Sequence, residues 1–229
     1  MVALTGQVGT ALIGKDAFQE VDITGATLPF TKHSYLVKDG LEIGRVLDEA
    51  FHIANTGRPG PVLIDLPMDL LKKEFDYPDE AEPVNVRGYR LLDKANESQI
   101  KKVAEAIKKA KKPIILAGGG IVSSDAIEEL RKFVDETDIP VVSTMMGLGI
   151  FPSEHPLYMG MLGMHGVKTA NEAVSKCDTM ILIGARVGDR AVRSPKFLAK
   201  TTKIIHIDVD PAEIGKNIHV DIPLVGDCG

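Results

Sequence analysis

Four apolar residues run directly into three glycines in the segment 113–120, Pro-Ile-Ile-Leu-Ala-Gly-Gly-Gly. Because no polar residue alternates with the apolar ones, the segment predicts a strand covered on both faces, as in a parallel sheet. The glycines allow a sharp turn and leave backbone amides without side chains in front of them. A helical pattern follows, in which Asp125 and Glu128 form a predicted capping box. Strand, glycine turn and helix are typical of a nucleotide crevice. The alternative is a glycine turn that only packs the helix on the strand.

The composition excludes several classes of protein. Of 229 residues, 44% are hydrophobic and 26% are charged, which favours a globular chain over a disordered one. The net charge of −5 comes without a long basic run, so we expect no nucleic-acid partner. No apolar run approaches the ~20 residues that cross a bilayer, so we expect no membrane association. Two cysteines far apart in sequence and the lack of a signal peptide favour a reducing, cytoplasmic location.

Strands alternate with helices along the whole chain, which predicts an α/β fold with parallel sheets and flanking helices. Residues 1–71 form one predicted unit, 72–95 a proline-rich, acidic linker, and 96–229 a second, Rossmann-like unit. The first unit has predicted strands at 2–4, 35–37 and 62–65 and a helix from Ile43 that ends before Gly57. In the second unit we expect helices from Asn96, over 125–136 and over 167–176, and strands over 113–117, 140–143, 180–184 and 203–208. Residues 144–166 are predicted as a loop rich in glycine and methionine.

The second unit has two further features of a dinucleotide site. Gly184-Ala-Arg186 closes one predicted strand, and Asp208 ends the next. In dinucleotide-binding proteins, the backbone amides of such a glycine turn bind the phosphate groups, and an acid about 20 residues later accepts a hydrogen bond from a ribose hydroxyl group. Arg186 could add a further contact to the phosphate groups. No complete Gly-x-Gly-x-x-Gly is present, and a simple strand-end cap is the alternative for Asp208.

Other candidate side chains lie in loops. His165 stands between glycines in Leu162–Gly166, although a surface or capping role is the commoner one for an isolated histidine. No ligand spacing links the six histidines, so we expect no metal site. Phe18 and Gln19 suit a small polar substrate, with a plain turn before a helix as the alternative. Arg190 suits a carboxylate, with a surface ion pair as the alternative.

Taken together, these segments resemble the acetohydroxyacid (acetolactate) synthase catalytic subunits, a family of thiamine diphosphate enzymes. The similarity runs in order from end to end of the chain. In the first unit it rests on residues 5–8, 13–22, 31–33 and 56–62, and in the second on 118–120, 143–149, 162–166, 184–186 and 206–210.

The resemblance implies that residues 1–71 are the C-terminal half of a pyrimidine-binding domain and that 96–229 are most of a central FAD-binding domain. The implied reaction joins pyruvate to pyruvate or 2-ketobutyrate with loss of carbon dioxide, in branched-chain amino-acid biosynthesis. FAD would be structural, and thiamine diphosphate and magnesium would act only in the complete enzyme. The implied partners are 2-keto acids, further copies of the subunit in a homodimer or tetramer, and a small regulatory subunit.

Residue roles follow from the same resemblance. Phe18 and Gln19 match positions beside the substrate, and Arg190 matches an arginine that recognises the second keto acid. The segments that contact FAD in the family match Gly118, Gly119, Thr144, Met145, Gly163, Met164, His165, Gly184, Arg186, Asp189, Asp208, Val209 and Asp227.

The chain departs from the family pattern at Gly9, where proline is usual, and at Val187-Gly188, where Phe-Asp is usual. Both lie near the implied substrate channel. The family's catalytic glutamate and its magnesium motif have no counterpart in these residues, so we expect the chain alone to be inactive. The alternatives are another enzyme on the same scaffold (a pyruvate oxidase, glyoxylate carboligase or decarboxylase) and a non-catalytic nucleotide-binding module.

Overall fold

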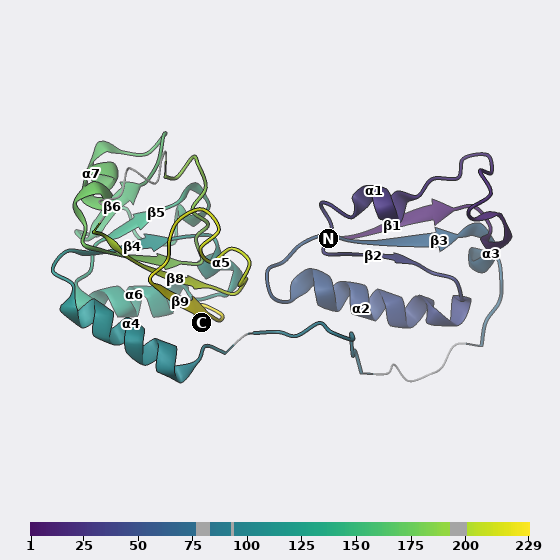
Figure 1. Ribbon diagram of the computed structural model, residues 1–229, viewed down its shortest axis with the longest axis horizontal. Coiled ribbons are helices and arrows are strands. Elements are labelled where there is room, and N and C mark those ends of the chain that lie inside the picture. The colour runs from purple at the N-terminus through teal and green to yellow at the C-terminus, as the bar shows by residue number, and fades with distance from the viewer. Residues whose placement is uncertain (77–82, 93, 193–200) are drawn as a thin grey trace. The chain divides into compact units, whose positions relative to one another are not determined.

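Figure 1 shows the computed structural model of the chain, which describes residues 1–76, 83–92, 94–192 and 201–229. The chain divides into two compact units, Met1–Leu91 and Leu92–Gly229. Each unit contains one sheet, and all neighbouring described strands are paired in parallel. The predicted α/β fold with parallel sheets and flanking helices is therefore confirmed.

The first unit has a three-stranded sheet in the order β1-β3-β2. Helix α2 covers one face and the short helix α1 the other (Figure 1). The apolar side of α2, including Val46 and Ile53, packs on Val62 and Ile64 of β3, which is buried along its whole length. Gly57 follows α2 with a φ of 57°, as predicted for the residue that ends this helix. The elements are β1 (Val2–Gln7), α1 (Ile23–Thr27), β2 (His33–Leu36), α2 (Ile43–Asn55), β3 (Val62–Pro67) and α3 (Met68–Leu71).

Part of the predicted linker 72–95 packs against the first unit. Val86 and Tyr89 lie against its core, and the Tyr89 hydroxyl group is 3.1 Å from both Lys32 Nζ and the Thr56 carbonyl oxygen. The boundary between the units falls at Leu91/Leu92. Residues 77–82 and 93 of this segment lie outside the described residues.

The second unit has a six-stranded sheet in the order β6-β5-β4-β7-β8-β9. The chain enters at β4 in the middle, runs outward to β6, and then returns to the other side of β4 to build β7, β8 and β9. This is the doubly wound order, whose direction reverses between β4 and β7. The elements are α4 (Glu97–Lys109), β4 (Pro113–Ala117), α5 (Gly120–Ser123), α6 (Ile127–Thr137), β5 (Val141–Ser143), β6 (Tyr158–Met161), α7 (Lys168–Lys176), β7 (Thr179–Ile183), β8 (Lys203–Asp208) and β9 (Ile222–Val225).

Both faces of the second sheet are covered. Helices α4 and α6 lie on one face and α7 on the other (Figure 1). Strand β4 contributes Ile115 and Ala117 to the first core, and Ile114 and Leu116 to the second. All four side chains are 2% exposed or less. The unbroken apolar run of β4 therefore has the two-sided burial that its sequence predicts.

Three details differ from the sequence predictions. The capping box of Asp125 is wrong, because α5 intervenes, Asp125 has a φ of 54°, and α6 begins after Ala126 without a side-chain cap. The predicted loop 144–166 contains the short strand β6, and the end of the chain contains β9. Both are edge strands of the sheet, where strands are short and Pro223 is tolerated.

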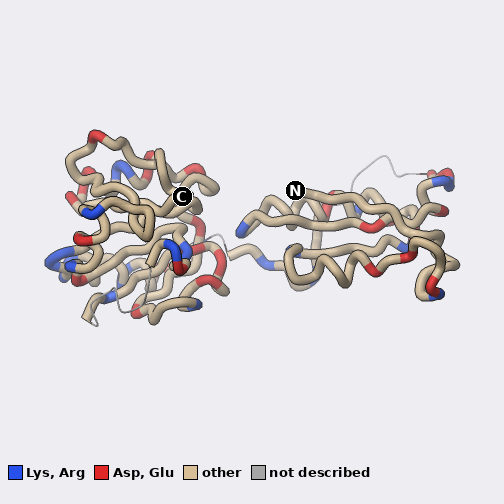
Figure 2. The backbone as a smooth tube through the Cα atoms, turned by 90° about the horizontal axis from the view of Figure 1, so that it is seen from above, with Lys and Arg blue, Asp and Glu red and all other residues tan. Residues whose placement is uncertain are grey.

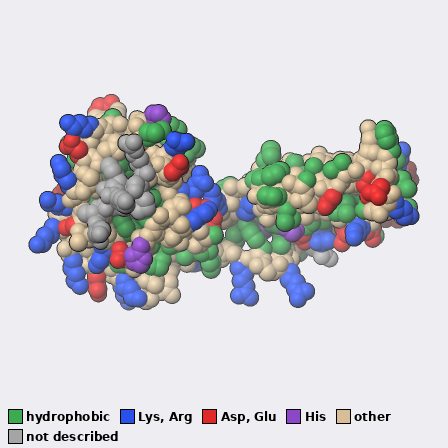
Figure 3. Space-filling view, turned by 45° about the horizontal axis from the view of Figure 1, so that its top comes forward, with side chains coloured by type: hydrophobic (Ala, Val, Ile, Leu, Met, Phe, Trp, Pro, Cys, Tyr) green, Lys and Arg blue, Asp and Glu red, His purple; other side chains and the backbone are tan. Residues whose placement is uncertain are grey.

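In the part of the chain that the structure describes, basic and acidic residues alternate along the chain trace of both units, without a long run of one sign (Figure 2). Hydrophobic side chains gather on the face of the first unit seen in Figure 3. Exposed apolar residues in this unit include Leu4, Val21, Leu28 and Phe30. Among the described residues, no helix is long and apolar enough to cross a membrane, and no group of three or more His, Cys, Asp or Glu is placed to hold a metal ion.

Candidate functional site

The candidate site lies where β4 and β7 end. These strands are neighbours in the sheet, and Ala117 of β4 is paired with Ile183 of β7. Their glycine turns, 118–120 and Gly184, therefore meet at the carboxyl edge of the sheet, at the point where the strand order reverses. Ligands of doubly wound folds bind at this position.

The two glycine turns pack directly on each other. The Gly118 amide donates to the Ile183 carbonyl oxygen at 3.0 Å, and the Gly120 amide to the Gly184 carbonyl oxygen at 2.9 Å. A Cβ atom on Gly118 would collide with that same Gly184 oxygen, and Gly184 itself has a φ of 54°. The amides of Gly118 and Gly120 are therefore already bonded to carbonyl groups of the β7 end. These two amides serve the packing role that was the alternative, and the cofactor role of Gly118, Gly119 and Gly184 stays a prediction.

Apolar side chains are exposed beside these turns. The Thr144 amide donates to the Ala117 carbonyl oxygen at 3.0 Å. The Thr144 hydroxyl oxygen accepts from the Gly147 amide at 3.1 Å. This fixes the turn after β5, and Met145 on it is 64% exposed. Met164, in the next loop, is 51% exposed. Flexible thioether side chains of this kind suit an irregular or planar apolar ligand.

The predicted residues of segments 163–165 and 189–190 come together. The Met164 amide donates to the Arg190 carbonyl oxygen at 3.0 Å, and a Cβ atom on Gly163 would collide with the same oxygen. The side chains of His165 and Arg190 are exposed, and Arg190 Nε lies 3.7 Å from Asp189 Oδ2. The loop after β6 and the loop after β7 are therefore in contact, and each carries an exposed polar side chain, His165 or Arg190.

Asp208 ends β8, as predicted, and is only 8% exposed. Its Oδ1 atom accepts from the Asp210 amide at 2.9 Å, which is the geometry of a strand-end cap. The Gly226 amide donates to the Asp208 carbonyl oxygen at 3.1 Å, so β9 brings Asp227 close to the end of β8. Asp227 is exposed and Val209 partly buried. The ribose contact of Asp208 stays a prediction.

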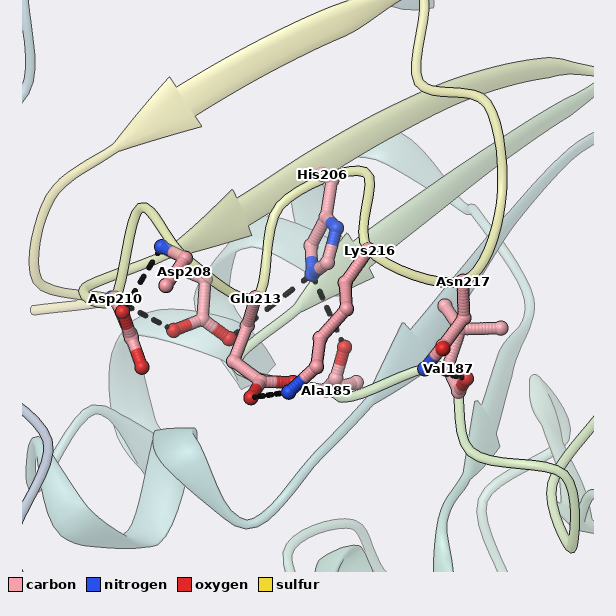
Figure 4. Close-up of polar contacts among 9 residues, drawn as sticks. Ala185, Val187, His206, Asp208, Asp210, Glu213, Lys216 and Asn217 are labelled. Atoms are coloured by element: carbon pink, nitrogen blue, oxygen red, sulfur yellow. Dashed lines mark hydrogen bonds and ion pairs between the residues drawn. The ribbon is translucent and has the colours of Figure 1, made fainter. Parts of the chain in front are cut away.

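His206 is a polar residue whose role sequence reasoning missed. It lies on β8, is 1% exposed, and its Nε2 atom is 3.1 Å from the Ala185 carbonyl oxygen and 3.9 Å from Asp208 Oδ2 (Figure 4). Its Nδ1 atom is buried without a hydrogen-bond partner. Burial lowers the pKa of His206 below its ordinary value, and the negative charge of Asp208 opposes this shift. A histidine inside the apolar run of a central strand is the signal that could have found it.

In the first unit, the Glu20 carboxylate shapes the loop that carries Phe18 and Gln19. It accepts from the amides of Gly14, Lys15 and Ala17. Gln19 has a φ of 62°, and Phe18 is 89% exposed. The hydrogen bonds from the Ala17 and Gly14 amides lower the pKa of Glu20. The loop therefore displays an aromatic ring and an amide, which fits the expected substrate-side position without testing it.

The first unit also contains a cavity that sequence reasoning missed. It has a volume of about 710 Å³ and lies at the carboxyl edge of the three-stranded sheet. Lys72 and Lys73 are exposed and form part of its wall. The residues around it are Thr10, Lys38, Asp39, Gly40, Asp69, Leu70, Lys72 and Lys73.

The sequence model of the thiamine pyrophosphate enzyme central domain matches residues 100–229, which hold almost all of the six-stranded unit and its glycine turns. The chain belongs to this family.

Acetolactate synthases are among the relatives of this thiamine pyrophosphate enzyme chain. The probable acetolactate synthase large subunit of Methanocaldococcus jannaschii is 51% identical over 231 residues, covering 100% of the chain and 39% of the relative. The acetolactate synthase large subunit of Corynebacterium glutamicum is 49% identical over 228 residues, covering 100% of the chain and 36% of the relative. The acetolactate synthase of Mycobacterium leprae is 48% identical, covering 99% and 36%. The chain thus spans less than two fifths of the length of these relatives.

The edge of the thiamine pyrophosphate enzyme central domain has a donor set that fits FAD. Arg186 is exposed and has no ion pair with any residue that the structure describes, so it can meet a phosphate. Met145 and Met164 are exposed apolar surface for a planar ring. Because the amides of Gly118 and Gly120 are already hydrogen-bonded within the chain, other groups at this edge would have to bind the phosphate groups.

Proposed function

We propose that this chain is part of an acetolactate synthase large subunit. Such a subunit condenses pyruvate with pyruvate or 2-ketobutyrate, with loss of carbon dioxide, in branched-chain amino-acid biosynthesis. The observation that carries the proposal is identity near 50% to acetolactate synthases along the whole chain, through both units. A shared fold alone supports many activities, whereas similarity that includes the loops at the site supports a shared reaction.

Thiamine diphosphate, when bound in the complete subunit, supplies the electron sink for decarboxylation and for joining the two keto acids. Within this chain, Phe18 and Gln19 would border the substrate, and the guanidinium group of Arg190 would pair with the carboxylate of the second keto acid. The exposed positions of all three side chains are compatible with these contacts. Magnesium would act in the complete subunit.

FAD would lie at the edge where β4 and β7 end, in a structural role. Arg186 would meet its phosphates, and Met145 and Met164 would pack on its rings. His165, Asp189 and Asp227 follow β6, β7 and β9, and Asp208 ends β8, so all four lie at the same edge of the sheet.

The similarity to acetolactate synthases also leads us to propose partners and a cellular location for the complete subunit. Two relatives are named large subunits, which supports a small regulatory subunit as a partner here. A homodimer or tetramer of the complete subunit and a cytoplasmic location complete the proposal. The 229-residue chain alone would form no acetolactate.

The test is an assay of the complete subunit that contains this chain, supplied with pyruvate, thiamine diphosphate, Mg²⁺ and FAD. The expected product is acetolactate, with the flavin absorbance remaining that of the oxidised form throughout turnover. Reduction of the flavin by pyruvate would instead indicate an oxidase. Binding of FAD without any conversion of pyruvate would indicate a nucleotide-binding module.

A further inference from the structure

The turn Gly184–Val187 leaves the sheet with three of its carbonyl groups held by three separate segments. Gly184 accepts from the Gly120 amide at 2.9 Å. Ala185 accepts from His206 Nε2 at 3.1 Å, and Val187 accepts from Asn217 Nδ2 at 2.7 Å (Figure 4). The exposed side chain of Arg186 lies between the last two contacts. Its backbone is therefore fixed by side chains that come from β8 and from the loop after it.

The segment 209–218 folds back over this turn. The Ala212 amide donates to Asp210 Oδ1 at 2.9 Å, and Lys216 Nζ pairs with Glu213 Oε1 at 2.9 Å. These contacts shape the segment so that Asn217 reaches the Val187 carbonyl group. Figure 4 shows His206 next to Ala185 and Asn217 next to Val187, at the two ends of the same stretch of chain.

A buried histidine at this position lowers the stability of the fold unless the hydrogen bond from its N–H group compensates for the loss. Its Nδ1 atom is buried without a partner, and an aliphatic side chain would leave no such group unsatisfied. Since Nε2 faces a carbonyl oxygen, the neutral ring carries its proton on Nε2. His206 is paired with Leu182 of β7 and with Pro223 of β9, neither of which is charged. The charged groups that face the imidazole ring are Asp208 and Glu213.

We propose that His206 and Asn217 form a latch that positions Arg186 for the phosphate groups of a dinucleotide cofactor. This inference rests on the proposed FAD site. Both are positioning residues, because they act through the Ala185 and Val187 carbonyl groups and not on the ligand. Loss of the latch frees the turn and lowers cofactor affinity while the six-stranded sheet remains folded.

The experiment measures FAD affinity of the 229-residue chain by quenching of flavin fluorescence, and exchange of the amides 185–188 by mass spectrometry. His206→Leu removes the donor, and we expect about tenfold weaker binding and faster exchange, as for the loss of one buried hydrogen bond. His206→Gln restores an N–H donor and should recover affinity to within about threefold. Asn217→Ala, at an exposed position, should weaken binding by about threefold to tenfold without unfolding the chain.

The pH profile separates positioning from simple packing. Protonation gives the Nδ1 atom a hydrogen that has no acceptor. FAD affinity of the wild-type chain should therefore fall as the pH is lowered below the ordinary histidine pKa, whereas the affinity of His206→Gln should not depend on pH in this way. The exposed His219, replaced by leucine, is the control and should leave affinity and profile unchanged.

Unchanged affinity and exchange in both His206→Leu and Asn217→Ala would overturn the latch. If His206→Leu fails to fold, Asn217→Ala and the pH profile of His206→Gln decide the question. If the wild-type chain binds no FAD, the proposed cofactor is wrong. Exchange at 185–188 in Asn217→Ala, which needs no ligand, then supports the latch if it is faster and overturns it if it is unchanged.

Discussion

Single glycines decide how closely β4 and β7 approach at their carboxyl ends. Gly118 faces the Gly184 carbonyl oxygen with no room for a Cβ atom. The sequence predicts a sharp turn here, but it does not reveal whether the missing side chain makes room for a ligand or for another part of the chain. In the structure, the missing side chain makes room for the Gly184 carbonyl group.

Gly118→Ala should therefore destabilise the second unit by about 1–3 kcal/mol, because the added methyl group forces the two turns apart. The measurement is urea unfolding followed by circular dichroism. Gly188→Ala is the matched control, since a Cβ atom there meets nothing within 4 Å and the expected change is within about 0.5 kcal/mol. Equal stability of the two variants would contradict the packing role.

His206 should make the stability of the second unit depend on pH. Its folded-state pKa is lowered by burial, so the unfolded chain takes up the proton first as pH falls. The contribution is fully present above the ordinary histidine pKa near 6.5 and is lost as pH falls from there toward the folded-state pKa. Urea midpoints of the wild-type chain between about pH 7.5 and 5 should fall more steeply than those of His206→Gln. Parallel curves would show that His206 does not titrate in this way.

At the scale of elements, strands buried on both faces are the most predictable. The apolar runs give β4 its bounds 113–117 and β8 its bounds 203–208. Edge strands were missed because β6 contains Gly160 and β9 contains Pro223, residues that signal loops unless the neighbouring strand is known. The predicted capping box at Asp125 was wrong because the spacing of two acidic residues does not reveal that the short helix α5 precedes α6.

The loop that displays Phe18 should depend on Glu20. Replacing Glu20 by alanine removes the acceptor of three backbone amides, so trypsin should cut after Lys15 several-fold faster than in the wild-type chain. Glu154→Ala is the control, because that exposed carboxylate accepts from the neighbouring Ser153 hydroxyl group. No change in cleavage at Lys15 would show that Glu20 does not order the loop.

At the scale of the molecule, the residues predicted for the second unit gather at one edge because all of them follow parallel strands. The sequence predicts this gathering through the alternation of strands and helices. It does not predict His206 and Asn217, because their contacts join segments about 20–30 residues apart through backbone carbonyl groups, which leave no pattern in side-chain types. The cavity lined by Lys38 and Lys72 was missed for a similar reason, since three segments far apart in sequence form it, around Thr10, 38–40 and 69–73.

The central claim is that the edge between β4 and β7 holds an adenine dinucleotide. The most direct measurement is amide exchange of the 229-residue chain with and without FAD. We predict protection at 144–147, 163–166 and 184–188, the loops that carry Met145, Met164 and Arg186. Protection confined to other segments, or no FAD binding at all, would contradict the claim.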